Sequence, residues 1–242
     1  MVLPSGMLLL FSVIDELKTL LQSKGADLVG IADLRKLTPD VRNNFPVGIS
    51  IAVALNPHII ANIQNGPTNQ YYLEYKRVND LLDKLGYSAV AFLNENGCKS
   101  ISLAVTNIGI DSETLSTILP HKTTAFRAGL GWIGKCALLV TKTYGSAIRI
   151  TTVLTDARLP TDNPVDTPLC GKCFSCVESC PVHAPSGKNW QPGMHRDDFY
   201  NAFACQENAL EMARKNVGIR LTLCGICIAV CPWTQKYIKK AN

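Results

Sequence analysis

The sequence predicts an α+β protein in two parts: an α/β domain over residues 1–160 and a small cysteine-rich domain over residues 161–242. Three observations indicate this. Helix-length and strand-length apolar patterns alternate through the first part. Eight of the ten cysteines lie between Cys170 and Cys231. Between the two parts, residues 159–168 interleave three prolines with acidic and amide side chains, which breaks the periodicity and is typical of a linker.

The first half of the α/β domain contains one predicted helix and two predicted strands. Apolar residues recur at helical spacing from residue 13 to 22, and Gly25 follows where a helix-ending glycine would lie. Residues 27–32 and 47–55 are short apolar runs separated by Pro and Asn. Near-continuous apolar strands are typical of a sheet that is covered on both faces, so we expect these strands to be buried.

The second half of this domain continues the alternation. One apolar stripe over residues 71–93 predicts a long helix. Residues 101–105 predict a strand, and residues from about 113 to 128 predict another helix. Residues 137–141 and 148–154 predict two strands that are joined through a glycine-containing turn. We therefore expect helices and strands to interleave throughout the domain.

The N-terminal run of residues 1–14 is apolar, but it lacks the Lys or Arg of a signal peptide and meets Asp15 and Glu16 too early to span a bilayer. We expect a cytoplasmic protein with no membrane contact. Its formal charge of +5 comes from 24 basic and 19 acidic residues that form no block of like charge, which is weak support for a nucleic-acid partner. With 47% hydrophobic and 18% charged residues, the composition excludes a disordered chain.

The clustered cysteines follow the pattern of bacterial two-cluster ferredoxins. Cys170, Cys173, Cys176 and Cys180 form the run C-x₂-C-x₂-C-x₃-C-P, in which three thiolates bind one [4Fe–4S] cluster and the fourth binds its neighbour. Downstream, a C-x₂-C-x₃-C-P run repeats half of this pattern, with one extra cysteine before it. This second group consists of Cys205, Cys224, Cys227 and Cys231.

Two cubic clusters need eight thiolates, and the two groups supply eight. Crossed ligation, as in the ferredoxin pattern, exchanges the cysteine of each Cys-Pro pair between the groups. One cluster then takes Cys170, Cys173, Cys176 and Cys231. The other takes Cys180, Cys205, Cys224 and Cys227. The second part of the chain is therefore predicted to be a ferredoxin-like domain with two [4Fe–4S] clusters.

A pair of Cys₄ zinc sites is the alternative, because C-x₂-C pairs also bind tetrahedral zinc. Zinc ribbons separate their pairs, whereas four cysteines here fall within eleven residues and end in Cys-Pro, which favours iron–sulfur clusters. A secreted disulfide framework is not indicated without a signal peptide. Cys98 and Cys136 stand alone in apolar surroundings, and we expect both to be buried as small hydrophobic residues rather than ligands.

Residues 129–135 read Gly-Leu-Gly-Trp-Ile-Gly-Lys and match the G-x-G-x-x-G pattern. In a dinucleotide-binding unit this pattern follows a strand and opens a helix. Here the order is reversed, because a predicted helix precedes the glycines and a predicted strand follows them. A nicotinamide site is therefore not indicated. The glycines indicate a tight turn or a close approach of the backbone to a bulky group.

The segment Ala128-Gly-Leu-Gly-Trp-Ile-Gly-Lys135, the segment Leu154-Thr-Asp156 and the cysteine-rich tail ending at Trp233 resemble the epoxyqueuosine reductase family and its shorter relatives. The resemblance is most specific from about residue 120 to 233. That family is similar to the reductive dehalogenases, in which a nitroreductase-like α/β domain holds cobalamin and two clusters supply it with electrons. The resemblance implies the same arrangement for this chain, and crossed ligation fits it.

Within this resemblance, Gly131, Trp132, Gly134 and Lys135 are the candidates for lining a cofactor cleft, and cobalamin is implied as a further cofactor. The sequence leaves open a second role for these residues as parts of a tight turn. The family's acidic proton donor belongs to an Asp-Ser-Ala-Pro segment, which this chain lacks before its glycine motif. The Asp111-Ser112 segment is displaced from that position. No catalytic residue is identified.

The resemblance implies an iron–sulfur oxidoreductase that passes low-potential electrons from its clusters to a cofactor or substrate in the α/β domain. The alternative is a non-catalytic, ferredoxin-like electron carrier for a partner protein. The expected partners are an electron donor such as a ferredoxin or flavodoxin and a small-molecule or protein acceptor. We expect tRNA to bind poorly, because the charge is mild and the family's C-terminal helical-repeat domain does not follow Cys231.

Overall fold

The computed structural model describes residues 5–106 and 109–241 of the chain. The first four residues of the apolar N-terminal run, and Asn242 at the end of the expected second domain, lie outside the described residues. Helices and strands are mixed through the described part, which confirms a fold of helices and sheet. Every helix in these described ranges is too short or too polar to cross a bilayer.

The chain forms two compact units, each assembled from separate segments. The first, here called the sheet unit, comprises Met1–Val53, Asn79–Leu130 and Arg149–Val165. The second, here called the cysteine unit, comprises Ala54–Val78, Gly131–Ile148 and Asp166–Asn242. The division of the chain at residues 160 and 161, which the linker composition indicates, stays a prediction.

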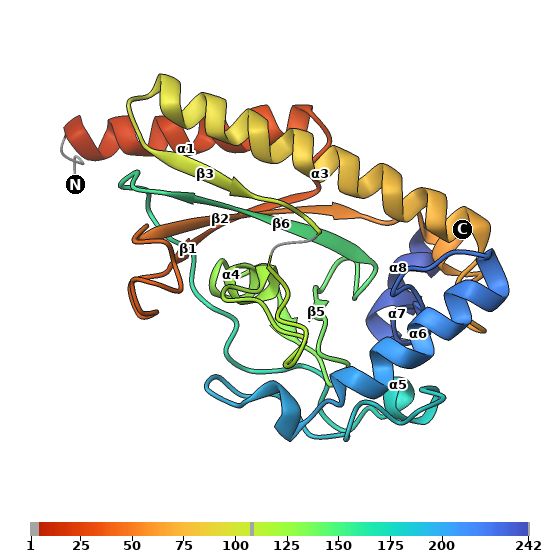
Figure 1. The fold of residues 1–242 in the computed structure, drawn as a ribbon. Helices are drawn as coiled ribbons and strands as arrows, with labels where there is room; N and C mark the ends of the chain where they lie inside the picture. The colour runs from red at the N-terminus through yellow and green to blue at the C-terminus, as the bar shows by residue number, and fades with distance from the viewer. Residues whose placement is uncertain (1–4, 107–108, 242) are drawn as a thin grey trace. The chain divides into compact units, whose positions relative to one another are not determined.

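A four-stranded sheet with the strand order β1-β2-β6-β3 is the centre of the sheet unit (Figure 1). β1 pairs antiparallel with β2, which places Val29 opposite Ile51. β3 pairs antiparallel with β6, which places Ile101 opposite Leu154. The sequence patterns predict all four strands, and their bounds are β1 (Leu28–Asp33), β2 (Val47–Ala54), β3 (Ser100–Leu103) and β6 (Ile148–Thr155).

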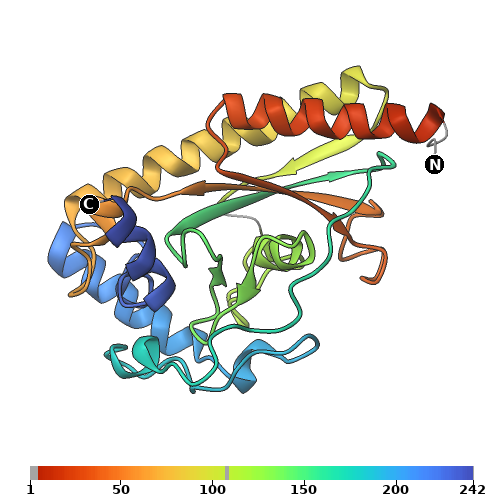
Figure 2. The ribbon, with the colours of Figure 1, turned by 180° about the vertical axis from the view of Figure 1, so that it is seen from behind.

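Helices cover both faces of this sheet. α1 (Ser5–Ser23) and α3 (Asn69–Glu95) lie along one face, and α4 (His121–Arg127) lies on the other, as Figures 1 and 2 show from opposite sides. β2 is buried along nearly its whole length for this reason. Burying one large apolar side chain contributes about 1.5–3 kcal/mol. Residues of the core that are at most 1% exposed include Leu17, Leu21, Ile49, Ile51, Leu82 and Leu85.

The predicted helix from about residue 113 to 128 is wrong in its first part, because α4 begins only at His121. Asp111 Oδ1 accepts hydrogen bonds from two backbone N–H groups of the following turn, at 2.8 and 2.9 Å. Leu115 then adopts a left-handed φ of 51°, and Pro120 precedes the helix. A side-chain turn competes with helix formation, and proline removes a backbone donor, so the segment turns before α4 starts.

The cysteine unit contains a two-stranded hairpin and short helices. The hairpin pairs β4 (Trp132–Ile133) with β5 (Leu139–Val140). The predicted strand over 137–141 is confirmed only for the two residues of β5, because Ala137 has a φ of 59° and belongs to the turn. Besides the start of α3, its helices are α2 (Pro57–Ile60), α5 (Ser175–Glu178), the 3₁₀ helix η1 (Arg196–Asp198), α6 (Ala202–Val217), α7 (Ile226–Ala229) and α8 (Pro232–Ala241).

The two cysteine motifs form two similar single turns of helix. α5 carries Cys176 and α7 carries Cys227, and these two helices contact each other. α8 begins at Pro232, directly after Cys231, because proline is tolerated in the first turn of a helix. The contact between the two motifs brings cysteines from distant parts of the sequence into one region.

Candidate iron–sulfur centre

A cavity of about 80 Å³ in the cysteine unit is lined largely by cysteines. One water needs only about 10–15 Å³ of such space, so the cavity has room for a larger group. Cys136 lines it together with members of both predicted ligand groups. The ligand cysteines that reach the cavity are Cys170, Cys173, Cys176, Cys227 and Cys231.

The cavity places Cys231 beside cysteines that lie much earlier in the chain. Cys170, Cys173, Cys176 and Cys231 are the set that crossed ligation gives to one cluster, and all four line this cavity. Cys227, which the same pattern gives to the other cluster, also reaches it, from α7. The contact between α5 and α7 accounts for this meeting of the two motifs.

The other predicted ligands lie near one another in the same unit. Burial is the main cause that raises the pKa of the Cys205 and Cys224 thiols, and the charge of Cys180 raises both further. Cys180 Sγ accepts a hydrogen bond from the Ala184 N–H at 3.3 Å. Burial thus favours the protonated thiols. Iron binds the thiolate rather than the thiol, so binding of a cluster would require these cysteines to lose their protons.

Hydrogen-bond donors surround the sulfurs of Cys170 and Cys231. Trp132 is fully buried, and its Nε1–H donates to Cys170 Sγ at 3.4 Å. Burial raises the pKa of the Cys231 thiol, whereas the first backbone N–H groups of α8 and the Ser146 hydroxyl act in the opposite direction. Hydrogen bonds to cluster sulfurs are one of the terms that set the reduction potential.

Lys135 is a buried cation beside the same cysteine loop. Lys135 is only 2% exposed. Nζ donates to the Cys173 carbonyl oxygen at 2.9 Å and lies 4.0 Å from the ring centroid of Phe174. A lysine is rarely buried without such partners. Its charge is placed to offset the negative charge of thiolate-bound iron.

Gly131 and Gly134 allow close packing within the β4–β5 hairpin. A Cβ at Gly131 would collide with the Val140 carbonyl oxygen, and one at Gly134 would lie 2.8 Å from Val140 Cγ2. Of the four residues predicted to bind a further cofactor, Gly134 and Lys135 line the cysteine cavity, while Gly131 and Trp132 are not among its lining residues. Their contact with a second cofactor stays a prediction.

Cys136 is the cavity residue that the sequence analysis treats only as apolar packing. It is buried as expected, and it lines the cavity together with Cys176 and Cys227. No ligand spacing marks it, because it lies in the hairpin far before the first motif. Cys98 is half-buried rather than buried, with Sγ 3.7 Å from the Asn96 carbonyl oxygen.

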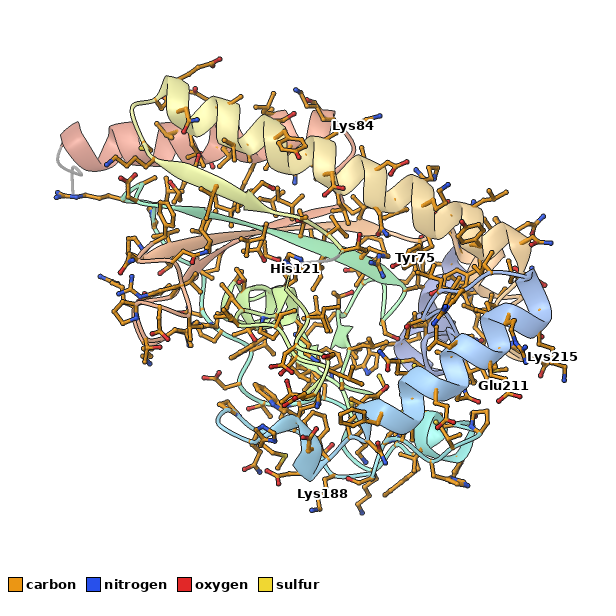
Figure 3. All side chains as sticks on the ribbon, in the orientation of Figure 1. Tyr75, Lys84, His121, Lys188, Glu211 and Lys215 are labelled. Carbon is orange, nitrogen blue, oxygen red and sulfur yellow. The ribbon has the colours of Figure 1, made fainter. Side chains whose placement is uncertain are left out.

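His121, at the start of α4 in the sheet unit, is labelled in Figure 3. Its Nε2 lies 3.0 Å from the Ala104 carbonyl oxygen and its Nδ1 lies 3.0 Å from the Thr152 hydroxyl. A carbonyl can only accept, so Nε2 carries the hydrogen and Nδ1 accepts from the hydroxyl. Burial lowers the pKa of His121, Arg149 lowers it further, and the Ala104 carbonyl opposes both. The neutral ring therefore holds the start of α4 against neighbouring segments.

Residues 169–234 match the family model of the 4Fe-4S double cluster binding domain. All eight predicted ligand cysteines lie inside this match. The epoxyqueuosine reductase of Aliivibrio fischeri is 32% identical over 162 residues, and that of Atelocyanobacterium thalassa is 29% identical over 217 residues. The chain resembles the epoxyqueuosine reductases.

These epoxyqueuosine reductases are longer than the aligned regions. The Aliivibrio fischeri match covers 67% of this chain and 40% of the relative. The Atelocyanobacterium thalassa match covers 87% of this chain and 64% of the relative. The chain thus spans less than two thirds of the length of either enzyme.

Solved structures of epoxyqueuosine reductase and of a reductive dehalogenase share the fold. The epoxyqueuosine reductase with an epoxyqueuosine-modified tRNA-Tyr stem loop matches with a TM-score of 0.63 and 20% identity, over 93% of this chain and 66% of that chain. A reductive dehalogenase whose structure suggests a mechanism for B12-dependent dehalogenation matches with a TM-score of 0.70 and 18% identity, over 90% of this chain and 31% of that chain. At these identities the likeness shows the fold alone.

Proposed function

We propose that this chain is an iron–sulfur reductase in which two [4Fe–4S] clusters pass single electrons to a cofactor or substrate. The observation that carries the proposal is the cysteine cavity, where Cys231 lies with Cys170, Cys173 and Cys176 inside a segment that matches a double-cluster domain. The relatives that share this sequence are named as reductases, which favours an enzyme over an electron carrier.

The proposed ligands are the eight cysteines in their crossed arrangement. One cluster would be held by Cys170, Cys173, Cys176 and Cys231. The other would be held by Cys180, Cys205, Cys224 and Cys227. All eight can supply thiolates, and seven of them follow the ferredoxin spacing, which fits this type of cluster. When bound, the clusters supply one-electron transfer.

The surrounding residues would stabilise the reduced, more negative form of the first cluster. Trp132 donates an N–H to the Cys170 sulfur, and the Ser146 hydroxyl acts to lower the pKa of the Cys231 thiol. Lys135 places a buried positive charge on the Cys173 loop. Burial of these groups strengthens each interaction, because water does not screen it.

A corrinoid is the second cofactor that we propose. The basis is the similarity of the fold to a reductive dehalogenase whose structure suggests a mechanism for B12-dependent dehalogenation. The side chains of Trp132 and Lys135 are buried inside the protein. Atoms of Val140 occupy the space beside Gly131 and Gly134. These four residues therefore offer no exposed surface that a corrinoid could contact. The proposal therefore rests on the fold, and we derive no reaction step through a corrinoid.

Titration of anaerobic, cluster-loaded protein with cobalamin tests the second cofactor by its absorption bands. Binding that shifts those bands would support the reductase with two kinds of cofactor. Trp132→Ala and Gly131→Val, in the same titration, would show whether the hairpin takes part. Absence of binding by fully loaded protein would contradict the corrinoid proposal and leave the clusters unaffected.

Electron paramagnetic resonance of ligand variants tests the crossed assignment. Cys180→Ala should perturb the same cluster signal as Cys224→Ala, and Cys231→Ala should perturb the same signal as Cys170→Ala. Cys98→Ala, which removes a half-buried thiol of the sheet unit, is the matched control and should perturb neither. If Cys180→Ala changed the same signal as Cys170→Ala, the crossed arrangement would be wrong.

We also propose a one-electron donor of the ferredoxin or flavodoxin type as the partner that reduces the clusters. Each cluster of this kind exchanges one electron at a time, so its donor must supply single electrons. Reduction of the loaded protein by such a donor, followed by the bleaching of cluster absorbance, would support this partner. If dithionite reduced the clusters but no ferredoxin or flavodoxin did, this proposed partner would be contradicted.

A further inference from the structure

α8 is packed against the rest of the cysteine unit along one side, where it lies beside α7 (Figure 1). Thr234 is fully buried, and its Oγ1 accepts a hydrogen bond from the Ser146 N–H at 3.1 Å. Ile238 is also buried, and the Tyr237 hydroxyl donates to the Leu55 carbonyl oxygen at 3.1 Å. These contacts hold the helix, so its other side lies at a fixed place on the surface of the unit.

The exposed side of α8 is basic. Lys236, Lys239 and Lys240 are exposed, and the helix contains no acidic residue. Trp233, Lys236 and Lys240 follow the spacing i, i+3, i+7, which places them on one face. Lys236 Nζ lies 4.5 Å from the ring centroid of Trp233, as in a cation–π contact. Among residues 5–106 and 109–241, the ion pairs include none of these lysines, so the charge of this face is available to a partner.

Trp233 connects this face to the cysteine cavity. It is half-buried, and it lines the cavity. Its ring meets the buried ring of Trp132 edge-on, with 5.2 Å between the centroids and 72° between the planes. Trp132 in turn donates its Nε1–H to Cys170 Sγ at 3.4 Å. Contacts between neighbouring side chains thus lead from the exposed face of α8 to a proposed cluster ligand.

We propose that this face of α8, formed by Trp233, Lys236 and Lys240, is the docking surface for an acidic one-electron carrier protein. The inference rests on the reductase function proposed above, because only a cluster in the cavity gives such a carrier something to reduce. Lysines steer an acidic partner into contact, and an aromatic ring among them supplies apolar area at the centre of the interface. The carrier is oxidised by one electron, the chain gains that electron, and no bond forms or breaks.

The size of the face suits this class of partner. Complexes between redox proteins are transient and bury less than about 1,200 Å², which one face of a ten-residue helix and its surroundings can supply. Nucleic acid is the other class of acidic partner, but its affinity comes from many phosphate contacts. α8 offers three lysines, and phosphate binding would give no reason for their position beside the cavity. The face therefore favours a protein carrier.

Binding of an acidic ferredoxin to the full chain tests the inference. Lys236→Gln combined with Lys240→Gln should weaken binding about tenfold at about 50 mM salt, because two exposed ion pairs that each contribute little are lost together. The second-order rate of cluster reduction by the same ferredoxin should fall by a similar factor. Both differences should shrink at about 500 mM salt, where the charges are screened.

The matched control combines Arg214→Gln with Lys215→Gln, which removes two exposed charges from the end of α6 in the same unit. Lys215 is labelled in Figure 3. The control should keep the affinity and the rate of the parent protein. Both double variants should keep about eight iron, as two cubic clusters require, and should be reduced by dithionite like the parent.

The affinity and rate of the parent in the α8 variant would overturn the inference, and so would an equal loss in the α6 control. Absence of ferredoxin binding to the parent would overturn it as well. If the α8 variant instead lost only the binding of a tRNA stem loop, the face would belong to nucleic acid and the inference would be wrong. A parent protein without clusters would defeat the proposed function, whereas each of the other results leaves that function standing.

Discussion

Single donors around the cysteine cavity are placed where they would affect how easily a bound cluster accepts an electron. Trp132 donates its indole N–H to Cys170 Sγ, and the Ser146 hydroxyl acts to lower the pKa of the Cys231 thiol. Each donor is buried, and a buried hydrogen bond to a charged acceptor is stronger than the same bond in water. The potential of a cluster in this site therefore depends on residues that bind no iron.

Trp132→Phe should lower the potential of the cluster bound by Cys170 without reducing the iron content. The change keeps a large buried ring and removes only the N–H that lies 3.4 Å from the sulfur. A hydrogen bond of this kind contributes about 1 kcal/mol, so the shift should be about 40 mV, since a tenfold change for one electron is about 59 mV. A redox titration followed by electron paramagnetic resonance measures it.

Trp190→Phe is the matched control, because Trp190 is also largely buried but does not line the cavity. It should leave the potential unchanged. A loaded Trp132→Phe protein with the potential of the parent would contradict the role given to the indole.

At the residue scale, spacing identifies seven of the eight cysteines as ligand candidates, and the count of eight thiolates that two clusters need adds Cys205. The same logic misses Cys136, which the fold brings to the same cavity as Cys176 and Cys227. The sequence singles out Trp132 and Lys135 as members of the glycine motif, but it does not predict their contacts with Cys170 and Cys173. Such contacts follow from tertiary packing and have no signature in a local pattern.

At the scale of elements, α4 is held at its start by a neutral histidine. The pKa of His121 is lowered mainly by burial, so the unfolded chain binds more protons than the folded chain between the folded-state pKa and about 6.5, the ordinary value. Stability is therefore complete above about pH 6.5 and falls as the pH drops towards the lowered pKa. His121→Gln, which keeps a donor and an acceptor, should remove this part of the pH dependence.

Urea unfolding at pH 7 and pH 5.5 measures this effect. The free energy of unfolding should fall more for the parent protein than for His121→Gln. His195→Gln is the matched control, because it removes an exposed imidazole, and it should keep the dependence of the parent. Equal falls for the parent and His121→Gln would contradict the buried, neutral histidine.

Long elements of the sheet unit could be predicted because their periodicity is repeated many times. α3 and the four sheet strands appear close to where apolar patterns place them, whereas α1 begins at Ser5, eight residues before the predicted start at residue 13. The segment before α4 could not be predicted, because Asp111 and Leu115 form a turn through local bonds and backbone conformation that periodicity does not report. β4 could not be predicted for another reason, because its two residues are too few to show an alternating pattern.

At the scale of the whole molecule, the two compact units are made of discontinuous segments. Residues 54–78 and 131–148 cluster with the cysteine motifs although they lie before them in the sequence. Composition predicts a linker near residue 160, but composition cannot say which distant segments pack together. That information lies in long-range contacts, which a single sequence does not display.

The whole-molecule charge leads to a prediction for tRNA. A related epoxyqueuosine reductase has been solved with a tRNA stem loop, whereas this chain has a formal charge of only +5. We expect weak binding of a tRNA stem loop that falls steeply with salt, since six or more phosphate contacts lose a factor of about 10³ or more between 50 and 200 mM salt. Fluorescence anisotropy at both salt concentrations measures this. Tight, salt-resistant binding of one defined stem loop would contradict it.

The most direct measurement is the metal and sulfide content of protein purified without oxygen. Two cubic clusters on eight cysteines predict about eight iron and about eight inorganic sulfide per chain, with replacement of Cys205 lowering both to about half. Stoichiometric zinc without sulfide in the anaerobic protein would contradict the account.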